Sequence, residues 1–202
     1  MTLAAPAGGV PVRGTVVLLP GRGEHPALYH RLATRLAFDG YRVTTELDSG
    51  PVVLLGHDTG ALRALELAAE HPVAAVVASG LPLGEPGGWT DELDARTACP
   101  VHRALLDRDD RFAAGALRGP VPGRAAAPDV PVLVLHGETD RVASPETARA
   151  FAETLPAGRF VLVGGGRHDV LNDVDHRSVA AEIVQFLEWL RAGKRAPALV
   201  RG

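Results

Sequence analysis

Residues 54–60, which read LLGHDTG, decide the fold because they join an apolar run to a helical pattern through a turn bracketed by glycines. A sharp strand-to-helix turn needs small residues such as Gly56 and Gly60 on both sides, since its central residue is strained and its neighbours approach closely. Such a turn lifts Asp58 above the end of the strand and aims the backbone N–H of Thr59 at a developing anion. An aspartate helix cap in an ordinary turn is the plainer interpretation of the same letters.

Outward from this turn, short apolar runs rich in valine and leucine alternate with stretches of helical periodicity. The expected strands are residues 15–19, 42–47, 52–55, 73–78, 131–135 and 159–163. The expected helices are residues 26–40, 61–69, 144–155 and 179–190. This alternation predicts an α/β protein with a mostly parallel sheet flanked by helices. A chain of 202 residues that is 46% apolar fills one core, so we expect residues 1–202 to form a single domain.

Residues 81–128 interrupt the alternation, because they carry many glycines and prolines and no run resembling a strand. Short helices are expected at residues 89–96, 101–106 and 110–117. We interpret the segment as a lid-like insertion folded over one end of the sheet.

Composition excludes several classes of partner. A net charge of −3 with scattered charges gives no basic face for a nucleic acid. No run approaches the ~18 apolar residues of a membrane span, and the N-terminus does not resemble a signal peptide, so a cytoplasmic location is expected. Cys99, the single cysteine, excludes an internal disulfide.

No cofactor or metal is expected either. The dinucleotide fingerprint G-x-G-x-x-G is met neither by residues 21–23 nor by residues 164–166. No histidine pair at metal spacing accompanies a cluster of carboxylates. The expected partner is therefore a small-molecule substrate.

Two further polar segments follow strands directly. Residues 136–142, HGETDRV, contain Asp140, and residues 164–169, GGGRHD, contain His168. The carboxyl ends of parallel strands meet at the crevice where open α/β sheets bind ligands. Asp58, Asp140 and His168 therefore follow one another in the chain order nucleophile, acid, histidine.

The pattern resembles the α/β-hydrolases over roughly residues 15–80 and 129–192. The segments LLPGRGEHPALYHRLA, LLGHDTGAL, LHGETDRVASP and GGGRHDVLND are most similar to the monoglyceride lipase and lysophospholipase branch. The resemblance implies a nucleophile elbow at Asp58, a general base at His168 and an orienting acid at Asp140. It also implies that the backbone N–H groups of Arg22 and Thr59 form an oxyanion hole.

Two departures from that family concern the site itself. Pro20 replaces the histidine that usually opens the turn after the first strand, and Asp58 replaces serine. Gly21 and His57 flank these positions and are candidates for contact with substrate, although His57 also fits a packed neighbour. Arg22 and Arg167 would favour an anionic substrate group if both pointed inward, solvated side chains being the alternative.

The aspartate changes the expected reaction, since a carboxylate displaces well at saturated carbon. Epoxide hydrolases and halide-removing hydrolases of this fold are similar at G-H-D-x-G and pass through an ester on the aspartate. Those enzymes add either two lid tyrosines, which protonate an epoxide oxygen, or tryptophan and asparagine N–H groups, which hold a halide. Here Tyr29 and Tyr41 both lie outside residues 81–128. The sequence therefore predicts a hydrolase of an ester, epoxide or related bond. A non-hydrolytic binding protein, or a lyase or cyclase that uses Asp58 as acid or base, is the alternative.

An unusually short connection between two expected strands supports the alternative. The first two strands usual in the family are expected to be missing, and only residues 48–51 separate the strand at 42–47 from the next. Parallel neighbours need a connection of a dozen or more residues. Three solutions stay open: residues 42–47 are not a parallel strand, the segment exchanges between subunits of a homodimer, or the sheet is rebuilt.

Overall fold

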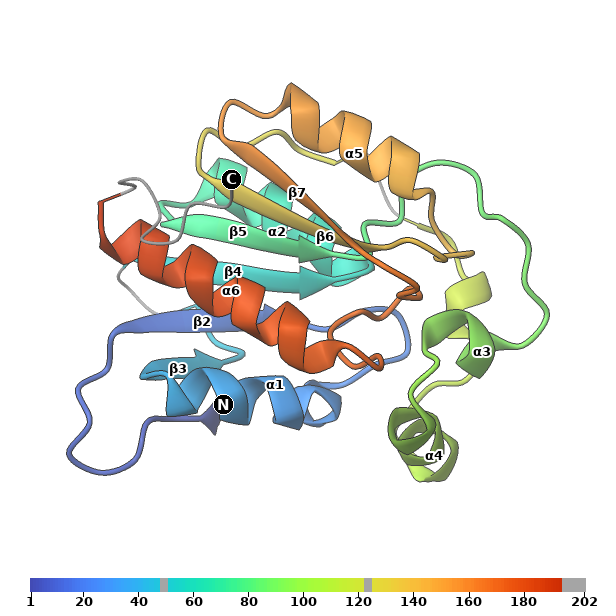
Figure 1. Ribbon diagram of the computed structural model, residues 1–202, viewed down its shortest axis with the longest axis horizontal. Helices are drawn as coiled ribbons and strands as arrows, with labels where there is room; N and C mark the ends of the chain where they lie inside the picture. Colours follow the sequence, from blue (N-terminus) through green and yellow to red (C-terminus); the bar gives the residue numbers. More distant parts are fainter. Residues whose placement is uncertain (48–50, 122–124, 194–202) are drawn as a thin grey trace.

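The computed structural model describes residues 1–47, 51–121 and 125–193, and it contains one seven-stranded sheet in the order β1-β3-β2-β4-β5-β6-β7 (Figure 1). The strands are β1 Thr2–Ala4, β2 Gly14–Leu19, β3 Tyr41–Thr44, β4 Val52–His57, β5 Ala75–Ser79, β6 Val132–Gly137 and β7 Gly158–Val163. Every neighbouring pair is parallel except β1 with β3. The predicted α/β class with a mostly parallel sheet is confirmed.

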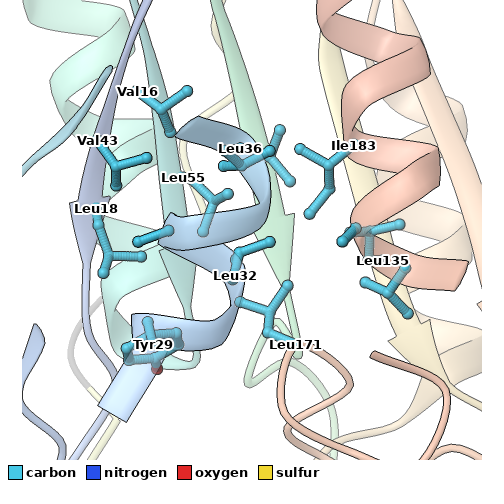
Figure 2. Packing of buried hydrophobic residues seen from close by; sticks show 14 of the residues in the cluster. Val16, Leu18, Tyr29, Leu32, Leu36, Val43, Leu55, Leu135, Leu171 and Ile183 are labelled. Atoms are coloured by element: carbon cyan, nitrogen blue, oxygen red, sulfur yellow. The ribbon is translucent and has the colours of Figure 1, made fainter. Parts of the chain in front are cut away.

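Helices cover both faces of this sheet. They are the 3-10 helix η1 Pro26–Tyr29, α1 His30–Phe38, α2 Thr59–Glu70, α5 Pro145–Thr154 and α6 His176–Arg191. Helices α1 and α6 pack on one face, and α2 and α5 pack on the other. Figure 2 shows the first of these layers, where Leu36 of α1 and Ile183 of α6 meet Leu55 and Leu135 of the sheet. These four side chains are wholly buried, and each contributes about 1.5–3 kcal/mol by leaving water.

Local signals explain where the helices begin and end. Gly40, at φ 93, follows α1 and takes the left-handed conformation that stops it. At the start of α5, the Ser144 side chain accepts a hydrogen bond from Thr147 N and Pro145 occupies the first turn, as the sequence predicted. Within the described residues, no helix has the length and apolar character needed to cross a membrane.

The first two strands usual in the family were expected to be missing, but one strand does precede β2. Thr2–Ala4 pairs antiparallel with β3, and Thr45 N donates to Met1 O beyond the last pair. Three residues are too few for a period-two pattern to show, so only the pairing reveals the strand.

Strand register also excludes one of the three solutions for the connection after β3. β3 is parallel to β2, so the solution in which residues 42–47 are not a parallel strand is wrong; the strand ends at Thr44, and β2 lies between β3 and β4. Thr44 is level with Val17 and Val52 with Thr15. Along the strand direction, the start of β4 therefore lies only two residues, ~6.6 Å, behind the end of β3. Across the sheet, it lies two strand spacings, ~9.6 Å, away. Residues 48–50 of this connection lie outside the described residues.

The described part of the segment between β5 and β6 lies beyond the carboxyl ends of the strands (Figure 1), and its role as a lid-like insertion stays a prediction. It contains α3 Glu92–Arg96, α4 Pro100–Arg108 and the 3-10 helix η2 Ala116–Arg118. The helix expected at residues 110–117 is wrong. Gly115, at φ 88, breaks the segment, and Ala113 N donates to Gly23 O in the loop after β2, which holds the segment as turns.

Candidate active site

Asp58 occupies a strained turn between β4 and α2. Its φ of 50° and ψ of −124° make it the one non-glycine residue with positive φ among those described. The turn depends on close backbone approach, because a Cβ at Gly60 would lie 2.1 Å from Leu19 O and one at Gly56 would lie 2.2 Å from Gly60 O. Such conformations cost of order 1–3 kcal/mol and cluster at functional sites. The strain distinguishes this aspartate from an ordinary helix cap, and its side chain makes no capping hydrogen bond.

Asp58, Asp140 and His168, far apart in the sequence, come together at the ends of β4, β6 and β7. His168 Nδ1 lies 2.8 Å from Asp140 Oδ2, and His168 Nε2 lies 3.4 Å from Asp58 Oδ1. The second contact has the distance of an ion pair, and Nε2 makes no hydrogen bond within the described residues. All three side chains are wholly buried. The juxtaposition expected from the three strand ends is therefore present.

Asp140 is held in place by its own loop. Its Oδ1 accepts hydrogen bonds from Val142 N at 2.7 Å and Ala143 N at 3.1 Å. Its Oδ2 faces His168 and also lies 2.9 Å from His136 Nε2. These contacts fix the carboxylate beside the imidazole of His168.

The buried charges reinforce one another. Burial lowers the pKa of His168, but the carboxylates of Asp140 and Asp58 more than offset this and raise it to about 10. Burial raises the pKa of Asp58, yet His168 and Arg22 together hold it well below its usual range. The pKa of Asp140 is likewise lowered by the two neighbouring histidines against the effect of burial. At neutral pH the site therefore holds an imidazolium between two carboxylates.

Arg22 donates hydrogen bonds to both oxygens of the Asp58 carboxylate. Its Nε and its backbone N donate to Oδ2 at 2.8 and 2.9 Å, and its Nη2 donates to Oδ1 at 2.8 Å. Nη1 donates to Leu117 O and Gly119 O of the insertion, at 3.0 and 2.9 Å. The solvated alternative for Arg22 is wrong, since only 11% of its side chain is exposed.

The other predicted positions lie nearby. Gly21 packs against Asp58 and His57, since an added Cβ would lie 2.9 and 3.0 Å from them. His57 is wholly buried, with its ring 4.9 Å from that of His168, in the place of a packed neighbour. Thr59 begins α2, and no hydrogen bond from it to Asp58 is seen among the described residues. Of the two backbone N–H groups predicted to form an oxyanion hole, that of Arg22 has an observed acceptor, Asp58 Oδ2. Arg167 points elsewhere, to Asp94 and Thr97 O of the insertion.

Arg96, which the sequence did not single out, ties the insertion to this loop. Its side chain is wholly buried, and it donates to Glu24 Oε1 at 2.7 Å, Arg22 O at 2.6 Å and Glu92 Oε1 at 2.8 Å. Its own carbonyl accepts from Asp169 N at 2.8 Å. A lone arginine in an irregular segment gives no sequence signal for such a role, because Glu24 and Arg22 lie more than 70 residues away from it.

Glu24, His57 and Asp169 form a second buried group, with ligand-type atoms within 4.8 Å of one another. It is the arrangement among the described residues that comes nearest to a metal site. Glu24 is already committed to Arg96, Tyr29 and Gly21 N, and Asp169 pairs with His102 at 3.2 Å. These partners favour a buried ion-pair network. The expectation of no metal stays a prediction.

Comparison with known proteins gives the same architecture. The family model described as serine aminopeptidase S33 matches residues 120–175, which include Asp140 and His168 but not Asp58. No curated protein matches the chain.

Solved structures match nearly its whole length. A soluble variant of monoglyceride lipase from Saccharomyces cerevisiae has a TM-score of 0.75 and 18% identity over 94% of this chain and 91% of that chain. The monoacylglycerol lipase of Paleococcus ferrophilus has a TM-score of 0.71 and 20% identity over 91% of this chain and 96% of that chain. An esterase from a Rhodococcus species has a TM-score of 0.66 and 18% identity over 93% of both chains.

The sheet order, the strained turn and these likenesses define the class: the protein has the α/β-hydrolase fold. Within that class it is similar to the monoglyceride lipases, as its motifs indicated.

Proposed function

We propose that this protein is a hydrolase of small organic substrates in which Asp58 is the nucleophile, His168 the base and Asp140 the acid that orients it. One observation carries the proposal: a wholly buried imidazole stands between Asp140, at 2.8 Å, and an aspartate in a strained turn, at 3.4 Å. Strain and buried paired charge both cost free energy, so their persistence at one point supports a chemical role.

The proposed first step is displacement at saturated carbon. Asp58 Oδ1 forms a bond to carbon, the bond to the leaving group breaks, and the leaving group departs with its electron pair. Oδ2, which accepts from the Arg22 backbone N–H, becomes the carbonyl oxygen of the ester. Water then attacks that carbonyl, and the same N–H stabilises the oxyanion that forms. The carboxylate of Asp58 is regenerated when the alcohol leaves.

His168 enters only in the second step. While Asp58 is charged, the pKa of His168 is raised to about 10, so the imidazole is protonated and cannot accept a proton. Esterification removes the negative charge of Asp58, and with it part of the stabilisation of the imidazolium. The pKa of His168 then falls, its proton passes to solvent, and the neutral ring accepts a proton from the attacking water. The base thus becomes active after the ester exists.

The test is to trap the ester. We expect His168→Gln, incubated with a panel of epoxides, haloalkanes and esters, to accumulate a mass increase on the peptide that contains Asp58. His176→Gln, a change at the first residue of α6, is the matched control and should turn over without accumulation. A panel that leaves the Asp58 peptide of His168→Gln unmodified, with no turnover by the wild type, would contradict the proposal.

A second observation favours the non-hydrolytic alternative. The Asp58 carboxylate is wholly buried and accepts three N–H groups from Arg22, so a substrate reaches it only after that contact opens. A protein that merely binds ligands, or that uses Asp58 as an acid or base, keeps this contact. Turnover that disappears in both Asp58→Asn and His168→Gln, together with an Asp58 ester, would exclude the binding function.

A further inference from the structure

A surface groove with a basic rim lies between α1 and α6, the two helices that cover one face of the sheet (Figure 1). Its volume is about 550 Å³, within the ~300–1,000 Å³ of small-molecule sites. Its floor is apolar, because the buried side chains of Leu32, Leu171 and Ala180 line it. Imidazoles and guanidiniums form the rim, and they belong to His30, Arg31, Arg35, His176 and Arg177.

The positive charge of this basic groove is not balanced. Among the described residues that line the groove there is no carboxylate. Asp39 pairs with Arg35 Nε at 2.9 Å, which leaves both terminal nitrogens of that guanidinium without a hydrogen-bond partner in the part of the chain that the structure describes. Arg177 makes no hydrogen bond or ion pair with any described residue. Uncompensated positive charge on a chain of net charge −3 favours an anionic ligand at this place.

An apolar groove continues the basic groove toward α4. Its volume is about 770 Å³, and His30 and Arg31 line both grooves. Val101 is 67% exposed and Leu105 45%, so aliphatic side chains of α4 face solvent here. Adjoining exposed apolar side chains mark binding grooves. The apolar residues that line this groove are Ala27, Leu28, Pro100, Val101, Ala104 and Leu105.

The two grooves are separate from the proposed active site. Asp58, Asp140 and His168 are wholly buried, and none of them lines either groove. A ligand in the grooves therefore needs no reaction at Asp58 and no opening of the contact between Asp58 and Arg22. The concave shape of both features also suits one extended molecule better than a flat membrane surface, which contacts protruding side chains.

We propose that these adjoining grooves bind a single-chain alkyl compound with an anionic head group. The head lies in the basic groove, where the guanidiniums of Arg35 and Arg177 offer the two-pronged geometry that suits an anion with two oxygens. The chain passes His30 and Arg31 and lies along the exposed apolar side chains of α4. The inference goes beyond the proposed function, because it concerns a second site.

Calorimetric titration with sodium decanoate, below the concentration at which it forms micelles, tests the site. Affinity should rise roughly 2- to 4-fold for each methylene added between octanoate and decanoate, since each methylene leaves water in the apolar groove. Acetate has the head without the chain, and octan-1-ol has the chain without the charge. Acetate should bind at least roughly tenfold more weakly than decanoate, and octan-1-ol more weakly than octanoate.

Matched variants locate the binding. Arg35→Gln/Arg177→Gln should raise the Kd of decanoate roughly tenfold, because two exposed charge pairs with the head are lost. Val101→Ser, a change in the apolar groove, should raise it by roughly 2- to 4-fold. Arg63→Gln is the control, since this arginine is 52% exposed and lies on α2, which packs on the other face of the sheet. It should keep the Kd of the wild type.

Several outcomes would overturn the assignment. They are an absence of decanoate binding, equal binding of acetate, and a Kd in Arg35→Gln/Arg177→Gln that equals the Kd in Arg63→Gln. Sedimentation with phosphatidylglycerol vesicles, lost in the double variant and without decanoate binding, would identify a membrane as the occupant instead. A dimer that the double variant disrupts, again without decanoate binding, would identify a second copy of the chain. None of these results bears on the hydrolase, which the trapping of an Asp58 ester measures separately.

Discussion

At Asp58, a carboxylate instead of a hydroxyl changes the protonation of its neighbour. A serine at this position would leave His168 paired with Asp140 alone, whereas the second carboxylate adds a negative charge 3.4 Å from Nε2. The raised pKa of His168 therefore has two sources, of which Asp140 is the larger. Removing either charge should have a graded effect.

We expect Asp58→Asn to lower the pKa of His168 from about 10, and Asp140→Asn to lower it further. Nitrogen NMR of the imidazole, followed from pH 5 to pH 11, measures both shifts. A wild-type imidazole that titrates near 6.5, or one whose pKa is insensitive to Asp58→Asn, would show that the two groups are not paired as described.

The same shift links stability to pH. Because the folded-state pKa of His168 is raised above the unfolded value of 6.5, its contribution is fully present below pH 6.5 and is lost as pH rises through about 10. The difference in free energy of unfolding between the wild type and His168→Gln should therefore shrink across that window. Urea denaturation at pH 6, 8 and 10 measures it. A difference that stays constant or grows with pH would contradict a protonated His168.

At the scale of elements, the strand-turn-helix unit at Asp58 depends on backbone contact that no side chain tolerates. An added methyl at Gly60 would lie 2.1 Å from Leu19 O and 2.5 Å from Pro20 O, so β2 and α2 would have to separate. Gly87, by contrast, has only ordinary contacts, the nearest at 3.6 Å from Arg141 Cα. The two glycines form a natural pair for a test.

Gly60→Ala should lower the free energy of unfolding by about 1–3 kcal/mol or more, since overpacking against backbone cannot be relieved by a rotamer change. Gly87→Ala should change it by less than ~0.5 kcal/mol. Thermal or urea denaturation of the two variants provides the comparison. Equal stability of the two variants would mean that the turn is looser than the structure indicates.

Sequence periodicity predicted those elements whose patterns are long enough to repeat. Residues 179–190 were recognised from their apolar stripe and form most of α6, and the runs behind β2, β4 and β6 were short, apolar and correctly placed. The three residues of β1 carry no such repeat. The segment at residues 110–117 has a helical composition, but Gly115 and the hydrogen bond from Ala113 to Gly23 determine its conformation.

The candidate site likewise has residues that the sequence predicts and residues that it does not. Asp58, Asp140 and His168 could be predicted to meet because each follows a parallel strand, and topology brings the carboxyl ends of such strands together. The hydrogen bonds of Arg22 and the burial of Arg96 could not be predicted, because each depends on the direction of a long side chain and on partners in the insertion. Periodicity contains no information about either.

At the scale of the whole molecule, the insertion does not merely lie above the site: hydrogen bonds of a buried arginine connect it to the loops around Asp58. Arg96 contacts the loop after β2 through Glu24 and Arg22 O, and its carbonyl holds Asp169 N beside His168. Glu92, its third partner, accepts hydrogen bonds from Gly115 N and Leu117 N in the turn that supports Arg22. One buried guanidinium thus couples three segments that surround Asp58.

Arg96→Met should therefore lower the free energy of unfolding by about 3–5 kcal/mol, because it leaves the carboxylate of Glu24 buried without its cation. Arg103→Met is the matched control in the same insertion. Its pair with Asp94 is about one-third exposed on both sides, so its loss should cost less than about 1 kcal/mol. Urea denaturation followed by circular dichroism compares the two.

The double variant Arg96→Met/Glu24→Gln distinguishes a charge network from simple packing. If the cost of Arg96→Met is largely that of an unpaired carboxylate, neutralising Glu24 removes it, and the double variant should be more stable than the sum of the single variants implies, by about 0.5–3 kcal/mol. Strict additivity would mean that Arg96 stabilises the fold through its packing, which includes its contact 5.0 Å from the Phe112 ring centre. In that case the insertion would cover the site without electrostatically holding the loop that carries Arg22.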